Sequence, residues 1–110
     1  MTEHDYTRMA AQLDRLAAVP DDVLADAVAR DGLWLRAFDG AAMPDLTGDA
    51  LPDRELATGL CAGCPVIDEC LELDLRTAGP DTVGVWGALP DTDRRALYPV
   101  WLRRRGGETR

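Results

Sequence analysis

The decapeptide CAGCPVIDEC, residues 61–70, contains all three cysteines of this 110-residue chain at the spacing C-x2-C-x5-C. Two thiolates three positions apart can bind one metal centre from a single turn of chain, and the third lies less than two helical turns further on. A disulfide would leave one thiol unpaired. Plain packing of buried thiols is the other alternative. We therefore predict a metal centre held by Cys61, Cys64 and Cys70.

Pro65 follows the second cysteine directly and predicts the start of a helix that ends near Ala78, where Gly79-Pro80 stops it. The free N–H groups and the positive dipole end of this helix would then face the thiolates. That arrangement favours bound anionic sulfur, and a thiolate-ligated iron–sulfur cluster is anionic.

The rest of the chain predicts an all-α fold, a small bundle of four to five short helices arranged around a metal-cluster site. We expect no confident strand, a loop over residues 31–50, and a tight turn over residues 82–89. Pro99 is expected to kink or divide the last helix, and the chain is expected to fray after Trp101. The expected helices cover residues 4–19 and 20–31, and others begin at Pro52, Pro65 and Pro90.

The formal net charge of −8 is unevenly distributed. Residues 1–90 carry 17 acidic residues and 6 arginines, whereas residues 91–110 carry 3 acidic residues and 6 arginines, and the chain has no lysine. A basic end suits DNA phosphates, although a solvated helix end that complements the dipole is the alternative. The arginines in question are Arg103, Arg104 and Arg105, with Arg94, Arg95 and Arg110.

The sequence shows neither an 18-residue apolar span nor the basic-then-apolar pattern of a signal peptide. We expect a cytoplasmic protein without membrane contact, in which cysteines serve metal chemistry more often than disulfides. The single histidine and the absence of a Gly-rich phosphate loop give no catalytic set, so we expect no enzyme and no catalytic residues.

The motif order beyond the cysteines is specific. The cysteine segment is followed by GVWGAL at residues 84–89 and DRRAL at residues 93–97. In this order the motifs resemble the WhiB-like family of actinobacterial iron–sulfur transcription regulators. The resemblance implies a 4Fe–4S cluster, sensing of redox state, oxygen or nitric oxide through it, and binding to the C-terminal domain of a primary sigma factor in RNA polymerase. It implies partner contact through Gly84, Val85, Trp86 and Gly87, and Trp86 could serve as core as well, since the two roles are not exclusive.

The chain departs from the family at one ligand. Family members carry a fourth cysteine 27 to 30 residues before the C-x2-C pair, where this sequence has Trp34. Indole has only an N–H donor and cannot ligate iron in this role. Three outcomes stay open: a carboxylate ligand, an exogenous ligand with a 3Fe–4S form as a variant, or loss of the cluster. The candidate carboxylates are Asp31, Asp39 and Asp45.

The same resemblance divides the chain into N-terminal helices (1–30), a WhiB-like domain (31–102) and a basic flexible tail (103–110). A cluster-free or zinc-binding helical interaction protein that docks a transcription partner is the alternative function. The colour and the metal content of the purified protein separate the two.

Overall fold

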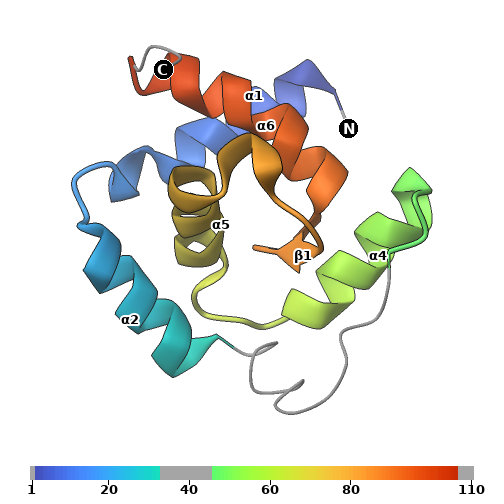
Figure 1. Cartoon of the computed structure of the whole chain (residues 1–110), viewed down its shortest axis with the longest axis horizontal. Helices are drawn as coiled ribbons and strands as arrows, with labels where there is room; N and C mark the ends of the chain where they lie inside the picture. The colour runs from blue at the N-terminus through green and yellow to red at the C-terminus, as the bar shows by residue number, and fades with distance from the viewer. Residues whose placement is uncertain (1, 33–45, 107–110) are drawn as a thin grey trace.

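The computed structural model describes residues 2–32 and 46–106, and these fold into helices packed around one central helix, α5 (Figure 1). A two-stranded antiparallel sheet of β1 (Val85–Trp86) and β2 (Leu89–Pro90) is the one addition to the expected all-α fold, which is otherwise confirmed. No described helix combines the length and the apolar character needed to cross a membrane. The helical elements are α1 (Glu3–Gln12), η1 (Leu13–Leu16), α2 (Asp21–Asp31), α4 (Ala50–Cys61), α5 (Ile67–Thr77), η2 (Gly79–Asp81) and α6 (Asp91–Arg104).

The first helix is shorter than its apolar spacing predicts. A capping box between Thr2 and Asp5 starts α1, but the chain tightens into the 3-10 segment η1 after Gln12. Residues three apart eclipse in a 3-10 turn. Leu13 and Leu16 therefore both point into the core, where they are almost completely buried.

The last helix is longer than expected. Pro99 lies within α6 without dividing it. One missing N–H costs less than burial of the surrounding apolar side chains gains, because Leu97, Val100 and Trp101 are all buried there. The expected fraying after Trp101 is wrong as far as Arg104, since α6 continues to that residue.

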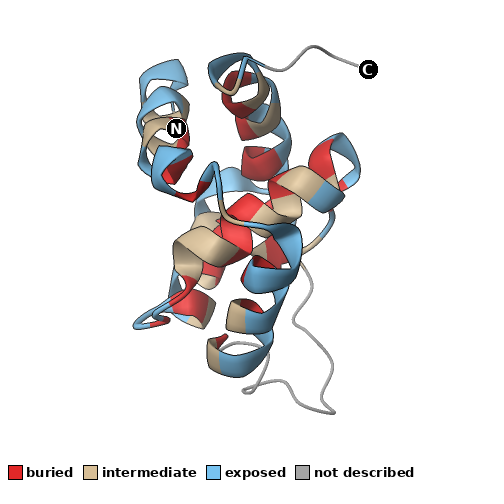
Figure 2. Ribbon diagram, turned by 90° about the vertical axis from the view of Figure 1, so that its left-hand side faces the viewer, coloured by how far each residue is buried: buried red, intermediate tan, exposed pale blue. Residues whose placement is uncertain are grey.

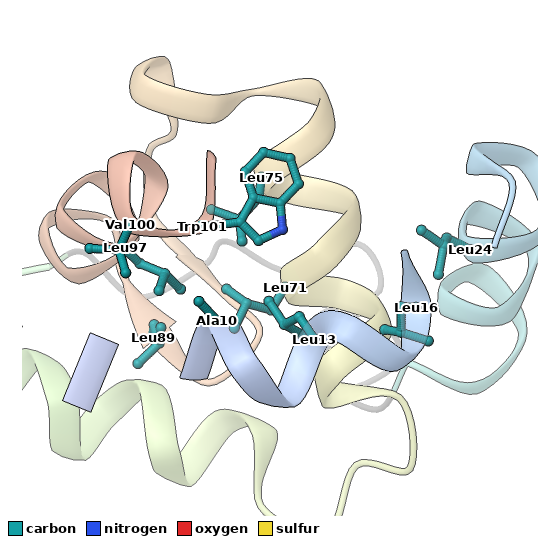
Figure 3. Packing of buried hydrophobic residues seen from close by; sticks show 10 residues of the cluster. All are labelled: Ala10, Leu13, Leu16, Leu24, Leu71, Leu75, Leu89, Leu97, Val100 and Trp101. Atoms are coloured by element: carbon teal, nitrogen blue, oxygen red, sulfur yellow. The ribbon is translucent and has the colours of Figure 1, made fainter. Parts of the chain in front are cut away.

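The main core lies between α5, α6 and the first two helical segments (Figure 3). Leu71 and Leu75 of α5 contact Leu97 and Trp101 of α6, and Leu13 closes the cluster from η1. Figure 2 shows the buried residues gathered on the inward faces of the helices, with exposed residues on the outer faces. Sandwiched in this way, α5 has little freedom to shift, and it positions one cysteine of the site.

A buried carboxylate links α5 to α6. The side chain of Glu72 has no solvent exposure and accepts hydrogen bonds from Arg76, Arg105 and the Trp101 indole. Burial alone would raise the pKa of Glu72, but these donors together hold the pKa below its usual value. The carboxylate therefore stays charged and keeps its partners in place.

A second carboxylate joins three helices. Asp93 of α6 accepts two hydrogen bonds from the guanidinium of Arg54 in α4, both at 2.8 Å, and one from the Tyr6 hydroxyl of α1 at 3.0 Å. Burial would raise the pKa of Asp93, yet the bonds from Arg54 and Tyr6 outweigh it and lower the pKa. This group therefore contributes stability that is present above the ordinary Asp pKa and is lost as the pH falls through the lowered value.

We expect Asp93→Asn to lower the free energy of unfolding at pH 7 by about 2–4 kcal/mol, because it leaves the Arg54 cation without its charged partner. The deficit should shrink at pH 3, which lies below the ordinary Asp pKa, because the stability that the Asp93 charge contributes is lost as the pH falls from that value through the lowered one. Urea unfolding at both pH values measures it. Glu55→Gln, an exposed change beside Arg54, is the control. An equal deficit for Asp93→Asn at both pH values would contradict the assignment.

Candidate metal centre

The structure buries all three cysteines. Cys61 is the last residue of α4, Cys64 lies in the following turn, and Cys70 lies in α5, with exposed fractions of 2%, 9% and 1%. None forms a disulfide. Cys64 and Cys70 belong to one small apolar cluster and Cys61 to another, and Ile67 and Trp86 pack against both clusters. That the three thiols hold one metal centre stays a prediction.

The turn between the first two cysteines differs from the expected one. Gly63 adopts a left-handed conformation at φ +75°, and the N–H of Cys64 donates to the carbonyl of Cys61 at 3.0 Å. The helix α5 then begins at Ile67, not at Pro65. Because the chain must first complete this reversal, the helix N-terminus that was expected directly behind Cys64 is displaced along the chain by two residues.

The segment over residues 84–90 forms a tight hairpin next to the cysteines. Trp86 pairs with Leu89 across two connecting residues, Gly87 and Ala88, with φ angles of +60° and +65°. Left-handed conformations at both central residues define a type I′ turn, which matches the twist of the flanking strands. The tight turn expected from the glycines is confirmed, while its pairing into strands was not expected.

Two hydrogen bonds fasten this hairpin to two different cysteines. The N–H of Ala88 donates to the sulfur of Cys61 at 3.3 Å, and the indole N–H of Trp86 donates to the carbonyl of Cys70. The half-buried Trp86 packs against both of the small apolar clusters that contain the cysteines. Trp86 thus packs against the cysteine site, and its role as a partner contact stays a prediction.

Gly87 allows the hairpin to approach α5 closely. A Cβ atom at this position would lie 2.7 Å from the Cβ of Leu71 and 2.9 Å from its Cα. Contacts this short do not occur between carbon atoms, so no side chain fits here. The hairpin rests directly on the backbone of α5 one residue beyond Cys70.

Arg94 of α6 also holds the hairpin, and the sequence analysis did not predict this role. Its guanidinium is completely buried; it bonds to Asp74 at 2.9 Å and to the Thr82 hydroxyl at 2.6 Å, and it also donates to backbone carbonyls of Val83 and Leu89. The expected contact of Arg94 with DNA is therefore wrong. A sequence signal existed, because Arg94 lies three residues before the buried Leu97 on one face of α6.

The site is apolar around its thiols. Burial raises the pKa of Cys61, although the bond from the Ala88 N–H and the charge of Arg94 act in the opposite direction. Burial, with the neighbouring thiols, raises the pKa of Cys70 to about 12. A bound cation would supply the positive charge that holds such thiols as thiolates. Within the described ranges, no three His, Cys, Asp or Glu side chains are grouped as ligands for a single metal ion.

The other candidate residues are distributed as follows. Asp31 ends α2 and pairs with Arg30 at 3.1 Å, whereas Trp34, Asp39 and Asp45 lie outside the described residues, as does Arg110. Arg95 donates to the carbonyl of Thr82. The basic end pairs with acidic residues of the same chain, through the ion pairs Arg103–Glu3, Arg104–Asp14 and Arg105–Glu72.

The structure thus defines a small helical domain in which a glycine hairpin contacts buried cysteines. Residues 38–97, which include every cysteine, the hairpin and Arg94, match the sequence model of the family described as Transcription factor WhiB. The chain belongs to this family.

Two relatives support the assignment. The chain is 42% identical over 59 residues to the "Transcriptional regulator WhiB1" of Bifidobacterium longum, which covers 54% of this chain and 62% of that protein. It is 41% identical over 64 residues to the protein of the same name from Mycobacterium tuberculosis, which covers 58% of this chain and 68% of the relative. The chain thus spans less than two thirds of the first of these. No solved structure matches it.

We expect Gly87→Ala to lower the free energy of unfolding by about 2–5 kcal/mol, from left-handed strain together with the clash against Leu71. Gly106→Ala is the matched control, because Gly106 has φ +69° with no atom near its Cβ position. That variant should lose only about 1 kcal/mol. Urea unfolding measures both. Equal losses would show that the hairpin does not rest on α5.

Proposed function

We propose that this protein is a cytoplasmic transcription regulator that holds an iron–sulfur cluster on Cys61, Cys64 and Cys70. We further propose that it binds the C-terminal domain of a primary sigma factor through the hairpin and contacts DNA through Arg103, Arg104 and Arg105. The relatives carry the name of transcriptional regulators and not of enzymes, which supports this class. The observation that carries the proposal is the attachment of one hairpin to two of three buried cysteines.

The donor set of the site fits an iron–sulfur cluster. The three buried thiols lie in two apolar clusters against which Trp86 packs, and one sulfur already accepts a backbone N–H, which is the usual support for cluster sulfurs. The charge of the buried Arg94 favours the thiolate form of Cys61. When bound, the cluster would supply an iron centre that reacts with oxygen or nitric oxide and exchanges one electron.

The fourth ligand distinguishes this chain from its family. Three cysteines leave one iron of a 4Fe–4S cluster without a protein thiolate. We propose that a carboxylate or an exogenous ligand completes the cluster, with 3Fe–4S as the form that follows loss of the exposed iron. Asp31 is the one candidate carboxylate ligand among the described residues. It lies at the end of α2 and forms an exposed ion pair with Arg30, and such surface pairs exchange readily.

The hairpin supplies a physical link from cysteine ligation to a partner. A change at Cys61 alters the sulfur that accepts the Ala88 N–H, and a change in α5 alters the carbonyl that accepts the indole of Trp86. Trp86 is half-buried beside the site. An aromatic side chain in this setting suits the centre of an interface.

We expect each of Cys61→Ser, Cys64→Ser and Cys70→Ser to lose most of its iron and sulfide after anaerobic purification, because a hydroxyl is a poor ligand for iron in a sulfide cluster. Ala57→Ser, which adds a buried hydroxyl near Cys61 without removing a thiol, should keep its iron. Iron, zinc and sulfide analysis with visible absorption measures this. Full iron in all three variants, or stoichiometric zinc in a colourless wild type, would refute the cluster.

We expect Trp86→Ala to weaken binding to the sigma-factor domain by at least about tenfold, as for a central aromatic contact. Leu51→Ala, at an exposed apolar residue of α4, should leave binding within about twofold. Calorimetry on samples with equal iron content measures both. Unchanged binding by Trp86→Ala would remove Trp86 from the interface.

A further inference from the structure

The N-terminal segment holds the basic end of α6. Arg103 pairs with Glu3 at 3.4 Å, and Arg104 makes a two-pronged pair with Asp14, with its shortest contact at 2.7 Å. Arg105 reaches the carbonyl of Leu13 at 2.9 Å. Each of the three consecutive arginines is therefore in contact with α1 or η1, or with the core beneath them.

The three arginines are held with different strength. Arg105 is anchored to the fully buried Glu72 and lies over the ring of Trp101, so its position is fixed. The pairs of Arg103 and Arg104 lie at the surface, where water competes with both partners. Surface ion pairs of this kind are weak and exchange readily. Two cations can thus be released while the helix end stays in place.

The two elements that meet here lie outside the family segment. The match covers residues 38–97, whereas α1 and η1 precede it and the last turns of α6 follow it. Figure 1 shows α1 lying alongside α6, and the apolar residues Ala10 and Leu13 pack against Val100 and Trp101. Packing of α1 and η1 against α6 therefore places Glu3 and Asp14 beside the arginines.

We propose that α1 and η1 form an autoinhibitory segment in which Glu3 and Asp14 occupy Arg103 and Arg104 and so restrain their contact with the phosphates of duplex DNA. The inference rests on the DNA contact proposed above. The Arg104 guanidinium donates to both oxygens of Asp14, and the same fork of N–H groups can donate to two phosphate oxygens. A phosphate backbone thus competes directly with these carboxylates.

The test compares two double variants that remove the same number of negative charges. Glu3→Gln with Asp14→Asn frees the arginines, whereas Asp26→Asn with Glu55→Gln neutralises exposed residues of α2 and α4 that make no ion pair in the described parts of the chain. All four positions are exposed, so folding should survive, and thermal unfolding checks this. Fluorescence anisotropy with a 20-base-pair duplex across a NaCl series measures affinity and its salt dependence.

The freed variant should bind the duplex more tightly than the control pair, with a slope of log affinity against log salt steeper by up to about 1.8, for two added phosphate contacts. Adding Arg103→Gln and Arg104→Gln should abolish the gain. The inference would be overturned if the two double variants bound DNA with equal affinity and equal salt slope. It would also be overturned if the tighter DNA binding survived the loss of both arginines, or if affinity rose for the sigma-factor domain and not for DNA. Iron content and sigma binding, measured on the same samples, separate this outcome from failure of the proposed function.

Discussion

The carboxylate of Glu72, without solvent exposure in the middle of α5, constrains the rest of the molecule. A buried charge is tolerated only when donors surround it. Arg76, Arg105 and Trp101 supply those donors, and Arg76 and Arg105 carry further N–H groups that bind carbonyls of Leu16, Val19 and Leu13. Satisfying one carboxylate thus draws η1, the start of α2 and the end of α6 together around the central helix.

With α5 fixed, its other side is available for the cysteine site. Cys70 lies there, and the hairpin sits on the backbone of Leu71 because Gly87 has no side chain. A second acid of the same helix, Asp74, holds Arg94, which in turn holds the carbonyls of the hairpin. Two acids of α5 therefore organise the two sides of the molecule, and the hairpin bonds to both Cys61 and Cys70.

Over the described residues, which end at 106, the uneven charge of the sequence does not produce a free run of arginines. Arg94 is completely buried, Arg105 is tied to Glu72, and Arg104 is paired with Asp14. The arginine-rich end instead closes the fold on its own acidic N-terminal segment. In a chain with a net charge of −8, the run of three arginines thus pairs with the chain's own acidic residues. The pairs of Arg103 and Arg104 lie outside the matched family segment.

The sequence by itself determined the helical class, most helix positions and the tight glycine turn, and it places the three cysteines within ten residues. These features depend on local chemistry: capping residues, proline and glycine positions, and the short spacing of residues 61–70. Only the tertiary structure decided that Arg94 lies inside, that the Ala88 N–H meets the Cys61 sulfur, and that Arg105 meets Glu72. The reason is physical: those partners lie 27 to 33 residues apart or are joined across separate helices, so packing selects them.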